Sequence, residues 1–206
     1  MKKTVWIGLI FFFFSFFRVY PQSGRPGIHV FGGISSPTEE HLGSAVVSGF
    51  GVNFPINSQF SIGLDYLLWK SSVSSGVGTS GLLEGEVNLS PFLLSIDYLI
   101  LPEARLSPYL MIGIGYVFSK FKIGNVFTIP EVTISQRLNN GIEFHGGGGL
   151  NIKLSESFGI FFDAIFMFRK AGGLTTYNDM NFGISRENFT ELLNSMIIRI
   201  GFKYFI

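Results

Sequence analysis

The feature that most constrains this chain is an alternation of apolar and polar residues with a period of two, sustained for about ten residues at a time. Near the C-terminus, for example, Ile198, Ile200 and Phe202 alternate with Arg199 and Gly201. Side chains two residues apart lie on the same face of a β-strand. The pattern therefore predicts a strand with one apolar and one polar face.

The same alternation recurs along the chain and predicts eight strands. They are Gly27–Ser35, Ala45–Phe54, Phe60–Leu68, Phe92–Ile100, Tyr109–Ser119, Ile142–Leu154, Phe158–Phe168 and Ile197–Phe205. After the first twenty residues no apolar run is long enough for a transmembrane helix, which needs roughly 18 or more residues.

The connections between these strands alternate in length. Short turns are expected at Pro55–Gln59, Pro102–Ser107 and Ser155–Ser157, and long polar loops at Ser36–Gly43, Ser71–Glu84, Phe121–Asn139 and Arg169–Asn194. Short turns at one end and long loops at the other are typical of outer-membrane barrels, in which the turns are periplasmic.

Composition separates a membrane barrel from a soluble β-sandwich. Hydrophobic residues make up 47% of the chain and charged residues 14%, and the polar face of the strands carries mainly glycine and serine. A sandwich or a lipocalin-like soluble barrel, which is the alternative, would expose many lysines and glutamates to water. The apolar face instead ends in aromatic residues that resemble interfacial girdles. These are Tyr98, Tyr116, Phe158, Phe168, Phe202 and Tyr204.

We therefore predict an all-β protein, an eight-stranded antiparallel up-and-down transmembrane β-barrel that follows an N-terminal signal peptide. In its last strand, Ile200 should face lipid, and Gly201 should face an interior that accepts a small hydroxyl.

The N-terminus has the pattern of a secretory signal. Lys2 and Lys3 precede an apolar run from Val5 to Phe17, which is short for a membrane span. We expect a signal peptide at residues 1–22, cleaved near Gln22 or Ser23, and a barrel domain at residues 23–206. An uncleaved anchor is the alternative. Export predicts a location in the outer membrane of a diderm bacterium.

Several function classes receive no support from the composition. A net charge of +1 with scattered basic residues argues against nucleic-acid binding. The absence of cysteine removes disulfides and thiolate metal sites. We expect no cofactor, no metal and a monomer.

Charged residues on the inward face form the candidate site. They are Asp65, Asp97, Glu143, Asp163, Arg169, Arg199 and Lys203. An eight-stranded barrel leaves room only for side chains, so these charges should pair and plug the lumen. We expect Arg199 to pair with Asp163 or Asp97. A gated proton or ion path along the same charges is the alternative.

An enzyme is not expected. Barrels that modify lipid A need a serine, a histidine and an acid together near the outer rim. The four glycines after His145 leave no serine near it, His29 lies at the periplasmic end, and His41 lies in a loop beside Glu39 and Glu40. No catalytic residues are assigned.

Three segments resemble those of OmpA- and OmpX-like outer-membrane barrels. The run from Pro108 to Tyr116 is similar to the P-Y-x-x-x-G-x-G-Y opening of that family's fifth strand. Gly146 to Leu154, followed by Phe158 to Asp163, resembles its next hairpin. The resemblance implies the barrel fold, and it covers essentially the whole mature chain.

The C-terminus resembles the signal that the barrel-assembly machinery recognises in this family. Phe202, Tyr204 and Phe205 would carry that signal, although the family usually ends on the aromatic residue and here Ile206 follows. The resemblance implies two partners, the outer-membrane lipid and the assembly machinery.

A fold of this kind hosts many functions. The first hypothesis is a structural or surface-interaction role through the extracellular loops, in adhesion, resistance to host factors or envelope integrity, with a surface ligand as partner. The second is a narrow channel or transporter for a small or hydrophobic solute. The third is a lipid-A-modifying enzyme.

Overall fold

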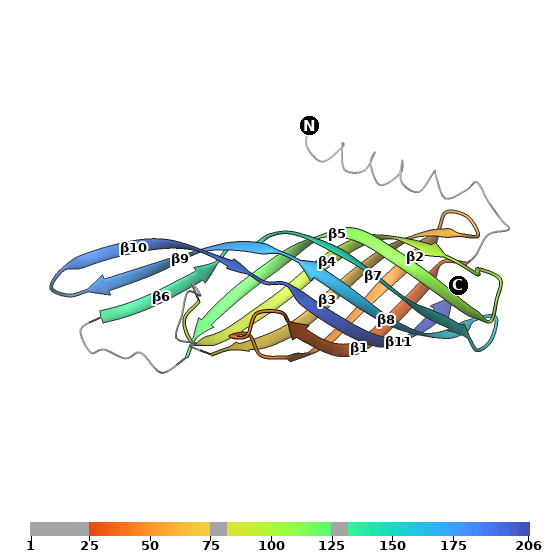
Figure 1. The fold of residues 1–206 in the computed structure, drawn as a ribbon, viewed down its shortest axis with the longest axis horizontal. Coiled ribbons are helices and arrows are strands. Elements are labelled where there is room, and N and C mark those ends of the chain that lie inside the picture. Colours follow the sequence, from red (N-terminus) through yellow and green to blue (C-terminus); the bar gives the residue numbers. More distant parts are fainter. Residues whose placement is uncertain (1–24, 75–81, 125–131) are drawn as a thin grey trace, which may run out of the picture.

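A computed structural model describes residues 25–74, 82–124 and 132–206 and shows a closed β-barrel with a small sheet at one end (Figure 1). The barrel strands are β1 (Gly27–Pro37), β2 (Ala45–Pro55), β3 (Phe60–Val73), β4 (Gly85–Leu99), β5 (Leu106–Ile123), β7 (Gly141–Lys153), β8 (Phe158–Phe168) and β11 (Ser195–Phe205). Their order around the wall is β1-β11-β8-β7-β5-β4-β3-β2. The predicted eight-stranded barrel is confirmed.

Every pairing in the wall is antiparallel, and closure comes from β1 against β11. Gly27 lies opposite Phe205, and the Ile206 amide donates to the Pro26 carbonyl at 2.9 Å. The beginning of β1 and the end of β11 therefore lie at the same end of the barrel. We call it the turn end because the three short connections also lie there. The opposite end is the loop end.

The small sheet at the loop end corrects the prediction of irregular loops. It consists of β6 (Val132–Leu138), β9 (Lys170–Asp179) and β10 (Gly183–Leu192), in the order β10-β9-β6. We expected loops at Phe121–Asn139 and Arg169–Asn194, and at Ser71–Glu84 the strands β3 and β4 also extend further than expected. In these strands polar residues such as Gln136 and Thr175 also occupy inward positions, so the alternation of apolar and polar residues that marks the barrel strands is not maintained.

Turn chemistry explains why β9 and β10 form a hairpin. The Asp179 carboxylate accepts hydrogen bonds from the amides of Asn181 and Phe182, at 2.7 and 3.2 Å. Gly183 then adopts a positive φ of 86°, a conformation that glycine reaches without strain.

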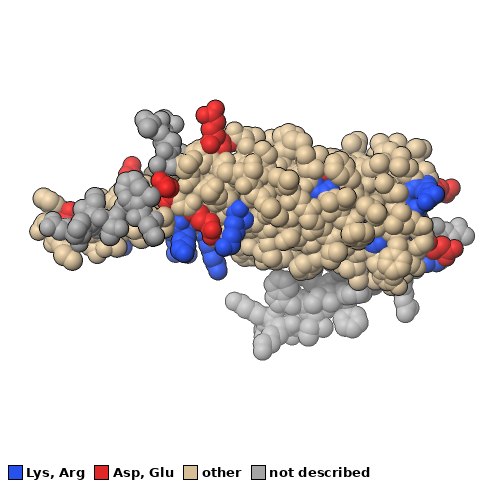
Figure 2. Space-filling model, turned by 90° about the horizontal axis from the view of Figure 1, so that it is seen from below, with Lys and Arg blue, Asp and Glu red and all other residues tan. Residues whose placement is uncertain are grey.

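The outer wall of the barrel is apolar in the alternating positions that the sequence predicts. Ile112 is 70% exposed and Ile200 59% exposed, whereas their inward neighbours are covered. Figure 2 shows the same division, because the wall between the two ends is mostly free of charge. A soluble protein does not expose so large an apolar surface, so this wall is built to face lipid.

Aromatic pairs border this apolar belt at both ends. Phe60 and Tyr98 pack at 5.2 Å between ring centroids near the turn end, and Tyr116 and Phe118 at 5.1 Å toward the loop end. Aromatic residues form girdles of this kind at the two membrane–water interfaces of outer-membrane barrels. The belt therefore has the girdles of a membrane-spanning barrel.

One expectation about the last strand is wrong. Gly201 faces inward as predicted, but the space beside it is already filled. A Cβ there would overlap the Phe161 ring and the Val30 carbonyl oxygen. Gly201 is thus a position of close approach, and no hydroxyl fits.

The predicted signal peptide at residues 1–22 and its cleavage site lie outside the described residues. Within the described ranges, no helix is long and apolar enough to cross a membrane.

The closed ladder predicts heat-modifiable migration on a denaturing gel. Inter-strand hydrogen bonds that leave no edge resist detergent until the sample is boiled. Unboiled protein should therefore run faster than boiled protein after extraction from membranes. Identical migration of the two samples would contradict the closed barrel.

Candidate functional site

Arg199 forms a crossbar in the lumen. From β11 its Nε and Nη2 donate to the two carboxylate oxygens of Asp163 on the adjacent β8, at 2.8 and 2.7 Å. Its Nη1 donates at 2.8 Å to Asp65, which lies across the lumen on β3. All three side chains are almost fully buried. One guanidinium thus connects opposite walls of the barrel.

Two further strands join this network. The Tyr109 hydroxyl of β5 donates to Asp163 at 2.7 Å, and His29 Nε2 of β1 lies 2.7 Å from Asp65 Oδ1. The guanidinium also lies 4.5 Å from the ring centroid of Phe31, in cation–π geometry. Charges buried in a narrow lumen are stabilised when they are paired and hydrogen-bonded, as Arg199, Asp65 and Asp163 are.

On the turn-end side of the crossbar the lumen widens into a cavity of about 540 Å³, which we call the vestibule. Its wall includes Asp97 and Lys203. Asp97 accepts hydrogen bonds from Asn53 at 3.0 Å and from Ser61 at 3.3 Å. The Lys203 ammonium has a long hydrogen bond of 3.4 Å to Asn151. Neither residue belongs to the crossbar.

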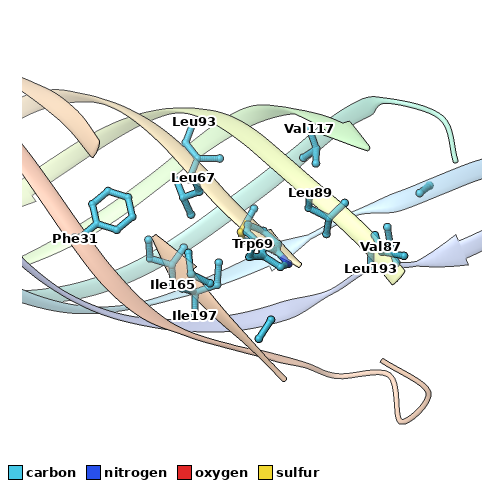
Figure 3. Packing of buried hydrophobic residues seen from close by; sticks show 14 of the residues in the cluster. Phe31, Leu67, Trp69, Val87, Leu89, Leu93, Val117, Ile165, Leu193 and Ile197 are labelled. Carbon is cyan, nitrogen blue, oxygen red and sulfur yellow. The ribbon is translucent and has the colours of Figure 1, made fainter. Parts of the chain in front are cut away.

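On the loop-end side of the crossbar the lumen is packed with apolar side chains, the apolar plug (Figure 3). Its members are Val47, Leu67, Trp69, Val87, Leu89, Leu93, Val117, Ile165, Met167 and Ile197. Each is at most 7% exposed. At the loop end itself, a second cavity measures only about 20 Å³. The plug thus lies between this cavity and the vestibule.

A second buried polar group lies among the apolar side chains. His145 Nδ1 is 2.9 Å from Glu143 Oε1, and both are fully enclosed. Gly113 and Gly115 on the neighbouring strand provide their space, because a Cβ at either position would overlap them. Arg169 lies closer to the loop end, where it donates at 2.7 Å to the Asn139 carbonyl.

The seven predicted charges therefore divide into three groups. Asp65, Asp163 and Arg199 form the crossbar, Asp97 and Lys203 line the vestibule, and Glu143 and Arg169 lie apart from both. Of the two acids expected to pair with Arg199, Asp163 does so, whereas Asp97 bonds to neutral donors. The register explains this, since Asp97 on β4 lies opposite Ser61, four residues closer to the turn end than Asp65 on β3.

The sequence reasoning assigned no role to His29, Tyr109 or Phe31. The alternation of inward and outward positions along each strand could have found them, because each occupies an inward position. Their distance from Arg199 was not accessible from this alternation, because it depends on how far each strand is staggered around the barrel.

The residues predicted as the assembly signal lie on both faces of β11. Phe202 and Tyr204 are exposed to the outside, whereas Phe205 lines the vestibule. Recognition by the barrel-assembly machinery stays a prediction.

Each histidine of the chain contacts a carboxylate. His29 and His145 have the contacts given above, and His41 Nε2 lies 3.1 Å from Glu191 at the loop end. Within the described ranges, no histidine ring is hydrogen-bonded to a serine, since Ser74 bonds only to the backbone carbonyl of His41. No three His, Asp or Glu side chains in these ranges could hold a metal ion. Each histidine ring is thus positioned by a carboxylate and not beside a serine that it could activate.

Comparison with solved structures decides the fold. The outer membrane protein OprG from Pseudomonas aeruginosa superimposes with a TM-score of 0.70 at 14% identity, over 88% of this chain and 96% of that one. The chain has the fold of the eight-stranded outer-membrane β-barrels. Neisserial surface protein A gives a TM-score of 0.55 at 9% identity, over 88% and 97% of the two chains. The outer membrane protein AlkL gives 0.53 at 17% identity, over 92% and 93%.

The sequence itself has no comparable match. No family model matches this outer-membrane-type barrel, and no curated protein matches it significantly. At such identities the structural likeness establishes the fold and leaves the function to the side chains of this chain.

Removal of the crossbar arginine should destabilise the barrel strongly. Arg199→Ala leaves the two carboxylates Asp65 and Asp163 buried without their cation, and breaking such a pair costs about 3–5 kcal/mol. Adding Asp163→Asn should restore part of that loss. Urea unfolding in vesicles, followed by tryptophan fluorescence, measures both effects.

Arg186→Ala is the matched control for this experiment, because Arg186 is exposed on β10 and its loss should change stability by less than about 0.5 kcal/mol.

Planar-bilayer conductance of the wild type should be small or absent. Steady conductance that Arg199→Ala alters, with stability unchanged, would contradict the plug and favour an ion path.

Proposed function

We propose that this chain is an integral outer-membrane protein whose lumen is closed and whose function is a surface interaction carried by the sheet β6-β9-β10. In this orientation the turn end is periplasmic and the loop end extracellular, as in other barrels with short turns and long loops. We infer a closed lumen because the crossbar and the apolar plug together fill the space between the vestibule and the loop end.

The observation that carries this proposal is the apolar tip of the β9–β10 hairpin, which consists of Met180, Phe182 and Ile184. Phe182 is 91% exposed and Met180 84% exposed. The ten residues of β9 extend this tip roughly 30 Å along the strand direction, away from the barrel wall (Figure 1). Large apolar side chains concentrated at a rigid protruding point are characteristic of a contact site.

The sheet β6-β9-β10, which we call the extension, holds this tip in a fixed position. Gln136 of β6 donates from Nε2 to the Thr175 hydroxyl at 2.9 Å and accepts from the Leu83 amide at 3.0 Å. Leu138 and Ala171 are buried at the base of the sheet. The hairpin is thereby connected to the barrel rim and does not have to be ordered when a partner binds, which lowers the entropic cost of binding.

The tip should mediate attachment to an apolar partner surface. Cells of a diderm host that display the protein should adhere to octyl-coated beads, and Met180→Ser with Phe182→Ser should reduce adherence about tenfold or more. Burial of each large apolar side chain contributes roughly 1.5–3 kcal/mol. Bead adherence at equal surface expression is the measurement.

A double variant with Ile56→Ser and Leu101→Ser is the matched control, since both are exposed apolar residues in turns at the opposite end. Equal adherence of the tip variant and the wild type would refute this role for the hairpin. Equal loss in both double variants would also refute this role, because the turn end is periplasmic and the loss would then come from folding or export and not from contact with the beads.

An interruption in one ladder of the wall favours passage of a hydrophobic solute as a second candidate function. The β3–β4 ladder pairs Tyr66 with Phe92 and Trp69 with Leu89 but is interrupted between these pairs. Pro91 lies in the interruption and has no amide hydrogen to donate. Trp69 and Leu89 also line the small cavity at the loop end. An apolar solute entering there would need only a short opening to reach lipid.

Pro91→Val tests this second candidate. Valine restores a donor and should complete the ladder, so uptake of an apolar dye into vesicles carrying the protein should decrease severalfold if the interruption is a route. Wild-type uptake no faster than that of protein-free vesicles would eliminate the candidate and leave the surface role alone.

A further inference from the structure

Beyond the apolar belt, the outward faces of β3, β4 and β5 carry three lysines in two adjacent rows. Lys70 and Lys120 lie on either side of Asn88 in the first row, and Lys122 lies opposite Glu86 in the second. All three lysines are exposed. We call Lys70, Lys120 and Lys122 the lysine patch.

The patch directly follows the loop-end edge of the belt. Two residues before Lys70 and Lys120, on the same faces, Leu68 and Phe118 are exposed apolar side chains. Phe118 and its partner Tyr116 are at the depth that aromatic girdles occupy. Two residues of strand span about 7 Å. The lysines therefore lie at the level of lipid headgroups.

The charge of the patch is only partly compensated within the chain. Glu86 lies 3.3 Å from the Lys70 ammonium and accepts a hydrogen bond of 3.0 Å from Asn88. In the described part of the chain, Lys120 and Lys122 have no ion-pair partner within 4.0 Å. Figure 2 shows charged side chains gathered where the barrel meets the extension, next to the uncharged wall. Three lysines against the one carboxylate of Glu86 leave an excess of positive charge for an external anion.

We propose that the lysine patch binds the phosphorylated headgroup of an outer-leaflet lipid, with Lys120 and Lys122 as the principal contacts. The inference rests on the membrane orientation given under Proposed function. A phosphate carries the charge and the several acceptor oxygens that two ammonium groups can share. The Asn88 amide and the Ser72 hydroxyl border the same rows and are further polar groups within the patch.

The position of the patch favours a lipid over a soluble phosphate. Below the lysines the wall is apolar, so acyl chains pack against Leu68 and Phe118 while the headgroup meets the ammonium groups. A soluble anion would gain only the charge contact. Each lysine near an anionic membrane surface strengthens binding roughly fivefold, so two lysines predict about a 25-fold effect.

Native mass spectrometry of the folded barrel in detergent tests the proposal, with lipid A as the phosphorylated probe and phosphatidylcholine as the uncharged reference. The variant Lys120→Gln with Lys122→Gln should bind lipid A about 25-fold more weakly. Arg137→Gln with Arg186→Gln is the matched control, because it removes two exposed positive charges from the extension. The control should bind lipid A as the wild type does, and inorganic phosphate should not compete.

Equal weakening in both double variants would overturn the proposal in favour of unspecific charge attraction, and unchanged binding in the lysine variant would overturn it outright. Competition by inorganic phosphate at the lipid concentration would replace the lipid with a soluble anion. Heat-modifiable migration of each variant verifies its fold. If the wild type fails to insert into vesicles, the membrane orientation fails first, and that result is distinct from a loss of lipid binding in an inserted barrel.

Discussion

The structure depends on the charge network around Arg199. A barrel of eight strands is closed by its own hydrogen bonds, but that closure leaves open what occupies the lumen. Arg199 determines this by joining β11 to β8 through Asp163 and to β3 through Asp65. The contact to Asp65 crosses the lumen and occupies it at this level, whereas strand number and stagger set the width of the barrel. The lumen can then differ on its two sides, with the vestibule toward the turn end and the apolar plug toward the loop end.

Glycine supplies the space that the network requires. Gly51 on β2 lies beside the pair formed by Asp65 and His29, and a Cβ there would overlap both side chains. On β5, Gly113 and Gly115 do the same for His145 and Glu143. At these positions a large inward side chain is therefore accommodated by a glycine on the next strand. The high glycine content follows from this steric requirement.

The sequence was sufficient to predict the strands that face lipid. It was insufficient for the strands and contacts that lipid does not constrain. All eight spanning strands and the inward position of Asp163 and Arg199 follow from a period of two. The contact between Arg199 and Asp65 does not, because it depends on strand stagger and on the length of one side chain. The strands β6, β9 and β10 were missed because water surrounds them, and both their faces tolerate polar residues. The prediction for Gly201 was wrong because the alternation shows which face of the strand a residue occupies but not how much space lies beside it.

The same contrast explains how the extension is able to keep open edges. In lipid an unpaired strand edge is prohibitive, and the wall has none. In water an edge is tolerable, but it invites pairing with other chains. The edge strand β10 carries Arg186 and Glu187 in its exposed middle, and charged side chains on an edge oppose such pairing. The apolar residues of the hairpin are instead confined to its tip, at Met180, Phe182 and Ile184. The edge is thus protected against indiscriminate association, while the tip remains the part of the extension that is suited to a contact.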